Sequence, residues 1–428
     1  MQQTFVELDL SILFLMSVIL IWFMIAYQLI LTLAGFFHYR NSAKEKHRVD
    51  TTQFDFPKVT ILIPAHNEEK VIGYTLDAMT KLDYPKECLD ILVINDGSSD
   101  STASIVKSFS DRFSTVRLFN VPKGEVGKGK SRALNLGLQQ TKADFIAVYD
   151  ADNSPHPSAL KYLMAQLLLD PTLGGVLGKF RTVNKNRNFL TRFINIETLS
   201  FQNMLQAGRW KLFKVSTLPG TNLVIRRDIL DRLNGWDESA ITEDSELSIR
   251  IYKLGYRIKF IPYSITYEQE PESWKVWIRQ RTRWVRGNNY VGKKFLKEIP
   301  AFKNKFLAVE LLYLLSLYYV FLVAIVSSDA LFILGYFDLV RITLPGPYTT
   351  VWVIALILFL LEILLALSYD REDKFSNVLL TLVMYFTYCQ FWIYIVGKAI
   401  YLDVIKKEKQ TWVKTVRFEV NPTEAQPK

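Results

Sequence analysis

Long apolar segments stand at both ends of the chain, and this arrangement limits what the chain can fold into. The first segment runs from Leu10 to Phe37, long enough to cross the ~30 Å hydrocarbon core of a bilayer as one helix. It lacks the basic start, short apolar centre and small-residue cleavage site of a signal peptide, so we expect a retained anchor. Three further apolar segments cover Phe306–Phe337, Thr350–Ser368 and Phe375–Tyr401, whereas the stretch between has ordinary soluble composition.

Charge predicts the orientation of these segments. The acidic residues Glu7 and Asp9 precede the first one, and Arg40, Lys44 and Arg48 follow it. Because basic flanks stay in the cytoplasm, we expect a multi-pass protein of the plasma membrane with its globular domain in the cytoplasm. The net charge of +10 suits anionic lipid, and no nucleic-acid partner is expected because the basic residues track the membrane boundaries.

The pattern divides the chain into five expected parts. They are a transmembrane anchor over residues 1–40, a cytoplasmic domain over 41–270, an interfacial helix region over 271–304, a transmembrane bundle over 305–402 and a basic tail over 403–428. A cytoplasmic tail requires an even number of crossings after the globular domain, yet three apolar segments follow it. The first, which contains Ser327, Ser328 and Asp329, could be a helix plus a short or re-entrant element. The crossing count therefore stays open, and a small membrane partner subunit is plausible.

Short apolar runs alternate with helical patterns in the globular part. Val59–Pro64, Ile91–Asn95, Val116–Val121 and Phe145–Tyr149 are typical of buried strands, each followed by a polar loop and an amphipathic stretch. This alternation predicts an α/β fold with a doubly wound, mostly parallel sheet. Ligands of such sheets bind at the carboxyl ends of the strands.

Acidic residues follow several of the predicted strands. Asp96 follows the second strand, and Asp150 and Asp152 follow the fourth. Such residues can simply cap the next helix. Two carboxylates one residue apart, however, repel each other unless a cation lies between them. Hard oxygen ligands of this kind predict Mg²⁺ or Mn²⁺ bound at Asp150 and Asp152 together with a diphosphate.

A second motif supports a different class of protein. Gly124–Ser131 fits the phosphate-loop pattern, with Lys130 as its lysine. It would make the chain a membrane-anchored ATPase. Against this, the loop follows the third predicted strand instead of the first, and the other acidic strand ends remain unexplained. We favour a basic loop beside a nucleotide site and keep the ATPase as an alternative.

Two later stretches complete the candidate site. Glu243 and Asp244 precede an amphipathic helical pattern, where they can cap the helix or supply a general base. Trp274–Lys297 mixes aromatic and basic residues, with Trp277, Gln280 and Trp284 on one helical face. A helix on the membrane surface would also have this composition.

The order of these motifs resembles one enzyme family. Asp96, Asp150-Ala151-Asp152, Thr242-Glu243-Asp244 and Gln280-Arg281-Thr282-Arg283-Trp284 are similar to the processive family 2 glycosyltransferases, which include cellulose, chitin and hyaluronan synthases. The likeness covers roughly Pro57 to Gly287 and looks strongest to the bacterial poly-N-acetylglucosamine synthases. It implies a GT-A-like sheet domain, with the helical patterns over Phe189–Phe213 and Trp274–Lys297 flat on the membrane.

The resemblance also implies a role for each candidate residue. Donor binding would fall to Pro64, His66, Asn67, Glu68, Asp96, Lys130, Asp150, Gln280, Arg283 and Trp284. Acceptor binding would fall to Gly220, Thr221 and Trp284, metal binding to Asp150 and Asp152, and catalysis to Asp244 as general base with Glu243 beside it.

The implied activity is the processive, inverting polymerisation of a UDP-sugar, with UDP-N-acetylglucosamine favoured over UDP-glucose. The product would be a β-linked polysaccharide exported across the membrane. The main alternative is a non-processive transferase that adds one sugar to a lipid phosphate, which should not need Gln280, Arg283 and Trp284.

Overall fold

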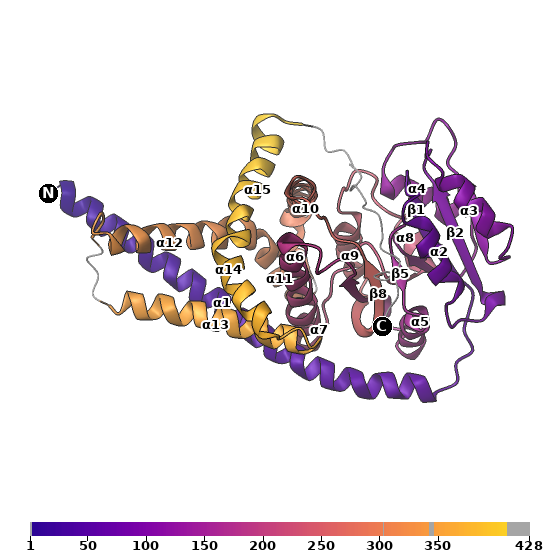
Figure 1. The fold of residues 1–428 in the computed structure, drawn as a ribbon, viewed down its shortest axis with the longest axis horizontal. Helices are drawn as coiled ribbons and strands as arrows, with labels where there is room; N and C mark the ends of the chain where they lie inside the picture. Colours follow the sequence, from indigo (N-terminus) through magenta and orange to yellow (C-terminus); the bar gives the residue numbers. More distant parts are fainter. Residues whose placement is uncertain (1, 303, 342–345, 409–428) are drawn as a thin grey trace.

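The computed structural model describes residues 2–302, 304–341 and 346–408. A sheet domain forms one end of the molecule and long helices form the other, with shorter helices between them (Figure 1). The outer part of the predicted basic tail, including Lys409, Lys414 and Arg417, lies outside the described residues.

One eight-stranded sheet, in the order β3-β2-β1-β4-β7-β6-β8-β5, organises the sheet domain. Its strands are β1 (Val59–Ala65), β2 (Leu89–Asn95), β3 (Val116–Asn120), β4 (Phe145–Val148), β5 (Ser154–Pro155), β6 (Leu173–Thr182), β7 (Leu223–Arg226) and β8 (Arg257–Glu268). The four predicted strands are present, and β3, β2, β1 and β4 pair in parallel. The sheet then becomes mixed, because β7 pairs antiparallel with both β4 and β6.

Helices cover both faces of this sheet, as a doubly wound fold requires. They are α2 (Ile72–Thr80), α3 (Thr102–Ser110), α4 (Lys130–Gln139), α5 (Ala159–Leu169), α8 (Arg227–Arg232) and α9 (Glu243–Lys253). Successive strand residues point to opposite faces. Ile61 and Ile63 therefore pack in one core with α2 and α5, while Leu62 packs in the other with α4 and α9. Burial on both faces explains why the parallel strands are apolar throughout.

Within the described residues, four helical runs are long and apolar enough to cross a membrane by length and composition: Leu10–Thr51, Lys305–Tyr336, Tyr348–Ser368 and Phe375–Ile405. The first lies within α1 (Gln2–Thr51). The second comprises α11 (Lys305–Ser316), the π-helical turn η4 (Leu317–Phe321) and α12 (Leu322–Tyr336). It is one continuous run, so the second short or re-entrant element considered from the sequence is absent among its described residues. The third run is α13 (Tyr348–Ser368).

The last apolar run differs in direction from the others. It comprises α14 (Phe375–Phe386), η5 (Tyr388–Gln390), α15 (Phe391–Ile400) and the π-helical turn η6 (Tyr401–Ile405). In Figure 1, α12 leads away from the sheet domain, α13 returns toward it, and α14 and α15 run across both. Arg286 Nε lies 2.6 Å from Asp403 Oδ1, which fixes the end of this run beside α10 (Trp274–Phe295).

Interface helices join the sheet to the long helices (Figure 1). They are α6 (Phe189–Ser200), the π-helical segment η2 (Phe201–Gln206), α7 (Ala207–Phe213) and α10, followed by η3 (Leu296–Ala301). They occupy both stretches predicted to lie on the membrane. α1 crosses η2 and α7 at backbone contact, because a Cβ on Gly208 would lie 2.2 Å from the Leu31 carbonyl oxygen. α1 also continues past the predicted anchor end at residue 40, and Glu45 pairs with Lys259 of β8 at 3.0 Å.

Candidate active site

A single cavity of about 710 Å³ begins at the carboxyl ends of β1 and β4 and continues between the long helices. Every site residue predicted from the sequence lines it except Asn67: Pro64, His66, Glu68, Asp96, Lys130, Asp150, Asp152, Gly220, Thr221, Glu243, Asp244, Gln280, Arg283 and Trp284. We call the part around Lys130, Asp150 and Asp244 the donor half. The part around Gln28, Arg209, Glu310 and Tyr313 is the membrane half.

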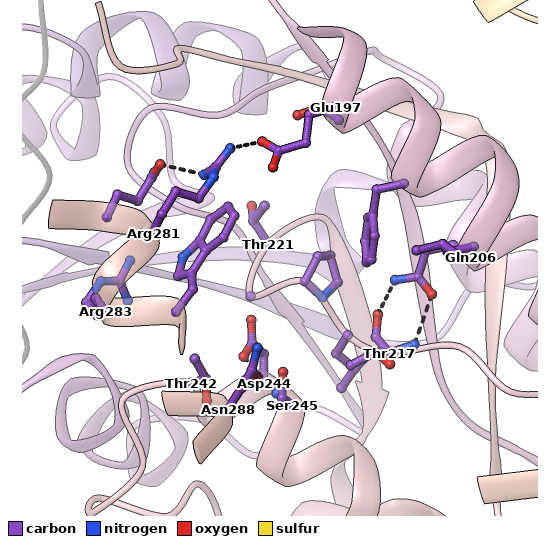
Figure 2. A pocket seen from close by; sticks show the side chains of 18 of the residues that line it. Glu197, Gln206, Thr217, Thr221, Thr242, Asp244, Ser245, Arg281, Arg283 and Asn288 are labelled. Carbon is purple, nitrogen blue, oxygen red and sulfur yellow. Dashed lines mark hydrogen bonds and ion pairs between the residues drawn. The ribbon is translucent and has the colours of Figure 1, made fainter. Parts of the chain in front are cut away.

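Asp244 lies in the first turn of α9 and faces the cavity (Figure 2). Its Oδ1 accepts a hydrogen bond of 2.7 Å from the Ser245 backbone N–H. Burial, followed by the charge of the neighbouring Glu243, raises the pKa of Asp244 from 3.8 to about 7 against the opposing charge of Lys130. A carboxylate with a pKa near neutrality is suited to accept a proton from a bound hydroxyl group.

Lys130 supplies the fixed positive charge of the donor half. Its Nζ donates to Asp150 Oδ1 at 2.6 Å and to the Gly220 carbonyl oxygen at 2.9 Å. It also lies 3.5 Å from Glu243 Oε1. Burial alone would lower the pKa of Lys130, but the Asp150 and Glu243 carboxylates outweigh burial and raise it above its ordinary value. Lys130 therefore remains charged and balances this acidic cluster.

Gly220 and Thr221 link β4 to the first turn of α9. Gly220 has φ +80°, and a Cβ there would lie 3.0 Å from Asp244 Oδ2 and 3.4 Å from Lys130 Nζ. A side chain at this position would therefore meet both backbone strain and the side chains of Asp244 and Lys130. Thr221 Oγ1 accepts a hydrogen bond of 3.1 Å from the Asp150 backbone N–H. The turn at Gly220 and Thr221 is thus joined directly to the strand end that carries Asp150.

The donor set at the end of β4 fits a divalent cation only when a substrate contributes ligands. Asp150 and Asp152 both line the cavity. Within the described part of the chain, no group of three or more His, Cys, Asp or Glu residues could hold a metal ion. Mg²⁺ typically uses one or two carboxylates together with substrate phosphates. The pair therefore suits a cation that binds together with a diphosphate.

The loops after β1 and β2 hold each other in place. His66 Nδ1 lies 2.6 Å from the Asp96 carbonyl oxygen, and Asp96 Oδ1 accepts a 2.9 Å hydrogen bond from the Gly127 N–H. The glycine-rich loop is thus fixed by Asp96, while Lys130 points into the acidic cluster. Asn67 does not line the cavity: its Oδ1 accepts from the Ser99 N–H at 2.7 Å, which joins the two loops. Asn67 thus connects the loops after β1 and β2.

α10 brings the last motif to the same cavity. Arg283 Nη1 donates to the Ile241 carbonyl oxygen at 3.3 Å, so it ties α10 to the loop that precedes Glu243. Gln280 and Trp284 line the cavity beside it. Trp277, predicted on the same face, is instead fully buried, and its Nε1 donates to the Tyr388 hydroxyl at 2.9 Å.

Sequence reasoning assigned no role to Glu197 or to Arg281, the second residue of this motif, although both line the cavity (Figure 2). Arg281 is buried, with Nη2 2.5 Å from Glu197 Oε2 and Nη1 2.7 Å from Gln280 Oε1. Its guanidinium carbon lies 3.9 Å from the centre of the Trp284 ring. The two residues of this pair, one in α6 and one in α10, are 84 residues apart in the sequence, so no local pattern could predict it.

The membrane half contains a polar cluster that was also missed. Arg209 Nε lies 2.5 Å from Glu310 Oε2, and both side chains are buried. The Tyr27 hydroxyl donates to Glu310 Oε1 at 2.5 Å, and Gln28 Nε2 donates to the Tyr313 hydroxyl at 3.3 Å. A charged residue such as Glu310 inside an apolar segment is itself a signal of function, and it could have drawn attention to this cluster.

Acidic side chains at the strand ends of a doubly wound sheet, together with a buried carboxylate of raised pKa, form a candidate enzyme site. Residues 57–287 match the profile of the family described as glycosyltransferase like family 2. The chain is also 44% identical over 410 residues to "Probable glycosyltransferase YdaM" of Bacillus subtilis (strain 168), covering 95% of this chain and 98% of that protein. The chain therefore belongs to glycosyltransferase family 2 and is a transferase, and the phosphate-loop ATPase is excluded.

More distant relatives are similar over part of the chain. A poly-beta-1,6-N-acetyl-D-glucosamine synthase of Staphylococcus epidermidis (strain ATCC 35984 / DSM 28319 / BCRC 17069 / CCUG 31568 / BM 3577 / RP62A) is 29% identical over 255 residues, which is 59% of this chain and 60% of that one. Among solved structures, the mannosyltransferase PcManGT from Pyrobaculum calidifontis, in complex with GDP-Man and Mn²⁺, has a TM-score of 0.54 and 22% identity. That match covers 84% of this chain and 98% of that one, and it supports the predicted GT-A-like fold.

Proposed function

We propose that this protein is a processive, inverting glycosyltransferase that polymerises UDP-N-acetylglucosamine into a β-linked polysaccharide and contributes to its export. The observation that carries the proposal is the continuity of the cavity. It runs from the carboxylates at the β4 end, past Trp284, to Gln28 and Glu310 between the long helices. A transferase that releases a water-soluble product after each addition has no need for such a continuation, whereas a growing chain or a lipid acceptor would occupy it. The choice of donor sugar rests on the likeness to the poly-beta-1,6-N-acetyl-D-glucosamine synthase.

In the proposed reaction, Asp244 takes the proton of the acceptor hydroxyl as that oxygen attacks the anomeric carbon of the donor. The bond from this carbon to the diphosphate breaks, and UDP leaves on the opposite face, which inverts the configuration. Gly220 leaves Asp244 Oδ2 accessible because it carries no side chain. The Arg283 guanidinium, on the same cavity wall, offsets the charge that develops on the leaving diphosphate.

Asp150 and Asp152 are the residues that would hold Mg²⁺ or Mn²⁺. When bound with the donor, the metal would neutralise charge on the diphosphate. Pro64, His66, Glu68 and Asp96 line the cavity nearby and are proposed to bind the nucleoside. Gln280 and Trp284 are proposed to hold the sugars at the entrance to the membrane half.

The membrane half favours a glycan acceptor over a lipid phosphate. A phosphate anion would need a free cationic partner, but Arg209 is already paired with Glu310 at 2.5 Å. Neutral sugar hydroxyls can instead exchange hydrogen bonds with Gln28 and Tyr313 without breaking this ion pair. Among the residues that the structure describes, the cluster therefore suits a neutral chain.

We further propose that the sheet domain faces the cytoplasm and that two passes follow it. In Figure 1, α12 leads away from the sheet domain and α13 returns, while α14 and α15 run in a different direction; we propose that these last two helices lie at the membrane boundary. This arrangement places Asp403, and the start of the basic tail, beside α10 on the sheet-domain side. With two passes after the sheet domain, the basic tail would lie in the cytoplasm, as the positive-inside rule requires. Neither a further crossing nor a partner subunit is then needed.

Product analysis tests this function. Purified full-length protein receives UDP-N-acetylglucosamine, UDP-glucose or ATP with Mg²⁺ or Mn²⁺, and the products are sized by chromatography. Long polymer from UDP-N-acetylglucosamine is expected. A single sugar on a lipid would instead support the non-processive alternative. Export is tested in sealed vesicles, where polymer made from outside donor should become resistant to an added glycan hydrolase.

A further inference from the structure

A chain of buried hydrogen bonds leads from the long helices to Trp284, and the proposed chemistry does not use it. Trp277 Nε1 donates to the Tyr388 hydroxyl at 2.9 Å, and this hydroxyl donates to Glu197 Oε2 at 2.7 Å. Glu197 Oε2 also pairs with Arg281 Nη2 at 2.5 Å. Arg281 in turn lies over the Trp284 ring.

The position of Arg281 constrains the indole of Trp284 directly. Its guanidinium carbon is 3.9 Å from the ring centre, which is the separation of a stacked cation and aromatic ring. One indole face is therefore covered by protein. Trp284 nevertheless borders the cavity and is only half-buried, so the rest of its ring can meet a ligand. Arg281 also donates to Gln280 at 2.7 Å, and thus orients two residues of the same motif.

Two elements outside α10 hold this guanidinium. Glu197 comes from α6, and Tyr388 comes from η5, where the break between α14 and α15 occurs. Thr387, just before η5, has φ −123° and ψ −80°, outside helical values. The break lets the fully buried Tyr388 reach Glu197. The orientation of Trp284 is therefore set jointly by an interface helix and by the last apolar run.

We propose that Arg281 is a positioning residue that fixes the Trp284 indole as the platform for the terminal sugar ring of the acceptor glycan. Glu197 and Tyr388 hold Arg281 in place for this purpose. The inference rests on the proposed function, in which Trp284 binds that sugar. A flat, fixed indole next to the donor half holds the terminal hydroxyl within reach of Asp244 through repeated additions. A loose indole would release the chain early.

The test uses full-length protein in detergent carrying Arg281→Lys, which keeps the charge but loses the planar guanidinium. Three quantities are measured: product length with UDP-N-acetylglucosamine, the KM for an added β-linked N-acetylglucosamine oligosaccharide, and donor hydrolysis. In donor hydrolysis, water replaces the acceptor: its oxygen bonds to the anomeric carbon, UDP leaves and the proton goes to Asp244. This reaction needs the donor half but no sugar on Trp284.

Arg281→Lys should shorten the polymer and raise the acceptor KM by about tenfold, the effect of losing an interaction of cation–π strength. The donor KM and donor hydrolysis should change less than about twofold. Glu197→Gln should act in the same direction. The matched control is Arg286→Lys on the same helix, which loosens the contact with Asp403 at 2.6 Å but does not touch Trp284. It should leave product length unchanged.

Unchanged product length and acceptor KM in Arg281→Lys would overturn the proposal. So would a loss of donor hydrolysis in step with polymer synthesis, because that pattern indicates general loosening. If Arg281→Lys does not elute as the unaltered protein does, Glu197→Gln decides by the same readouts. Absence of polymer from the unaltered protein with every UDP-sugar would instead overturn the proposed function, so the two failures are distinguishable.

Discussion

The two halves of the cavity are built in opposite ways. In the donor half, Lys130, Asp150 and Asp244 come from the ends of neighbouring elements of one sheet domain, and their charges are concentrated. In the membrane half, Gln28, Arg209 and Glu310 come from three helices, and the Arg209–Glu310 pair neutralises itself. Under the proposed function, the donor half would bind a charged diphosphate and the membrane half a neutral chain. Substitutions that separate donor chemistry from chain handling test this difference.

The largest effect is expected for Asp244→Asn. Removing a general base slows a proton-transfer step by about 10²- to 10⁴-fold. Donor affinity should remain nearly unchanged, because Asp244 acts on the acceptor side. Radiolabelled sugar incorporation measures turnover, and calorimetry with UDP measures binding. Turnover within about tenfold of the unaltered protein would show that another group is the base.

Metal removal should have the next largest effect. Dialysis against EDTA is expected to reduce polymer synthesis by about 100-fold or more, since a metal stabilises the leaving diphosphate by several kcal/mol. Mg²⁺ or Mn²⁺ should restore it in the unaltered protein but not in Asp152→Ala. The exposed Asp83, which pairs with Lys161 at 2.9 Å, offers Asp83→Ala as a control that should recover fully.

Gly220→Ala should reduce turnover by about 10- to 100-fold, because a small displacement of reacting groups has large kinetic consequences. The added Cβ would lie 3.0 Å from Asp244 Oδ2. Gly255→Ala is the matched control: Gly255 has φ +89°, but no atom lies within 4 Å of its Cβ position. It carries the backbone strain without the displaced carboxylate. Equal activity losses in the two variants would assign the effect to strain alone.

The pH dependence should report the raised pKa of Asp244, which is about 7. The base is the ionised carboxylate, so activity is present above this pKa and is lost as the pH falls through it. Turnover should be about tenfold lower at pH 6 than at pH 8. A pH series with saturating donor measures it, and a flat profile over this range would contradict the assigned base.

The smallest effect is expected in the membrane half. Glu310→Gln leaves the buried Arg209 without its counter-charge, and it should shorten the product or slow elongation by about fivefold or more. Donor hydrolysis should be unaffected. The control is Glu298→Gln, which removes an exposed pair with Lys253 and should leave product length unchanged. Equal losses of hydrolysis and polymer in Glu310→Gln would remove the distinction between the two halves.

The sequence predicted which side chains lie together in the donor half, because the signals for their positions are local. Apolar runs mark β1 to β4. Asp150 lies just after β4, and Asp244 lies in the first turn of α9. The Glu197–Arg281 and Arg209–Glu310 pairs could not be predicted, because packing between distant helices creates them. Trp277 and Trp284 lie on the helical face that their spacing predicts. Trp277 is buried against Tyr388, however, whereas Trp284 borders the cavity.

The direction of α14 and α15 was equally beyond sequence reasoning. An apolar run of adequate length shows that a helix can span a bilayer, but not that it does, since packing against neighbouring helices sets its tilt. Here the run passes beside α10, and Tyr388 and Asp403 fix it there. Under the proposed topology of two passes after the sheet domain, the apparent conflict between three apolar segments and the basic tail disappears, because this run is then not a crossing.

α1 has a mechanical consequence. Its 50 residues form about 75 Å of helix, more than twice the thickness of a hydrocarbon core. At Gly208, the backbones of α7 and α1 are in direct contact, which prevents α1 from sliding along its axis. Glu45, near the C-terminal end of α1, pairs with β8. α1 therefore connects its apolar run directly to the sheet domain. A thicker or thinner bilayer would change the tilt of α1 and move the sheet domain with it. The rate of polymer synthesis should therefore depend on the acyl-chain length of the surrounding lipids.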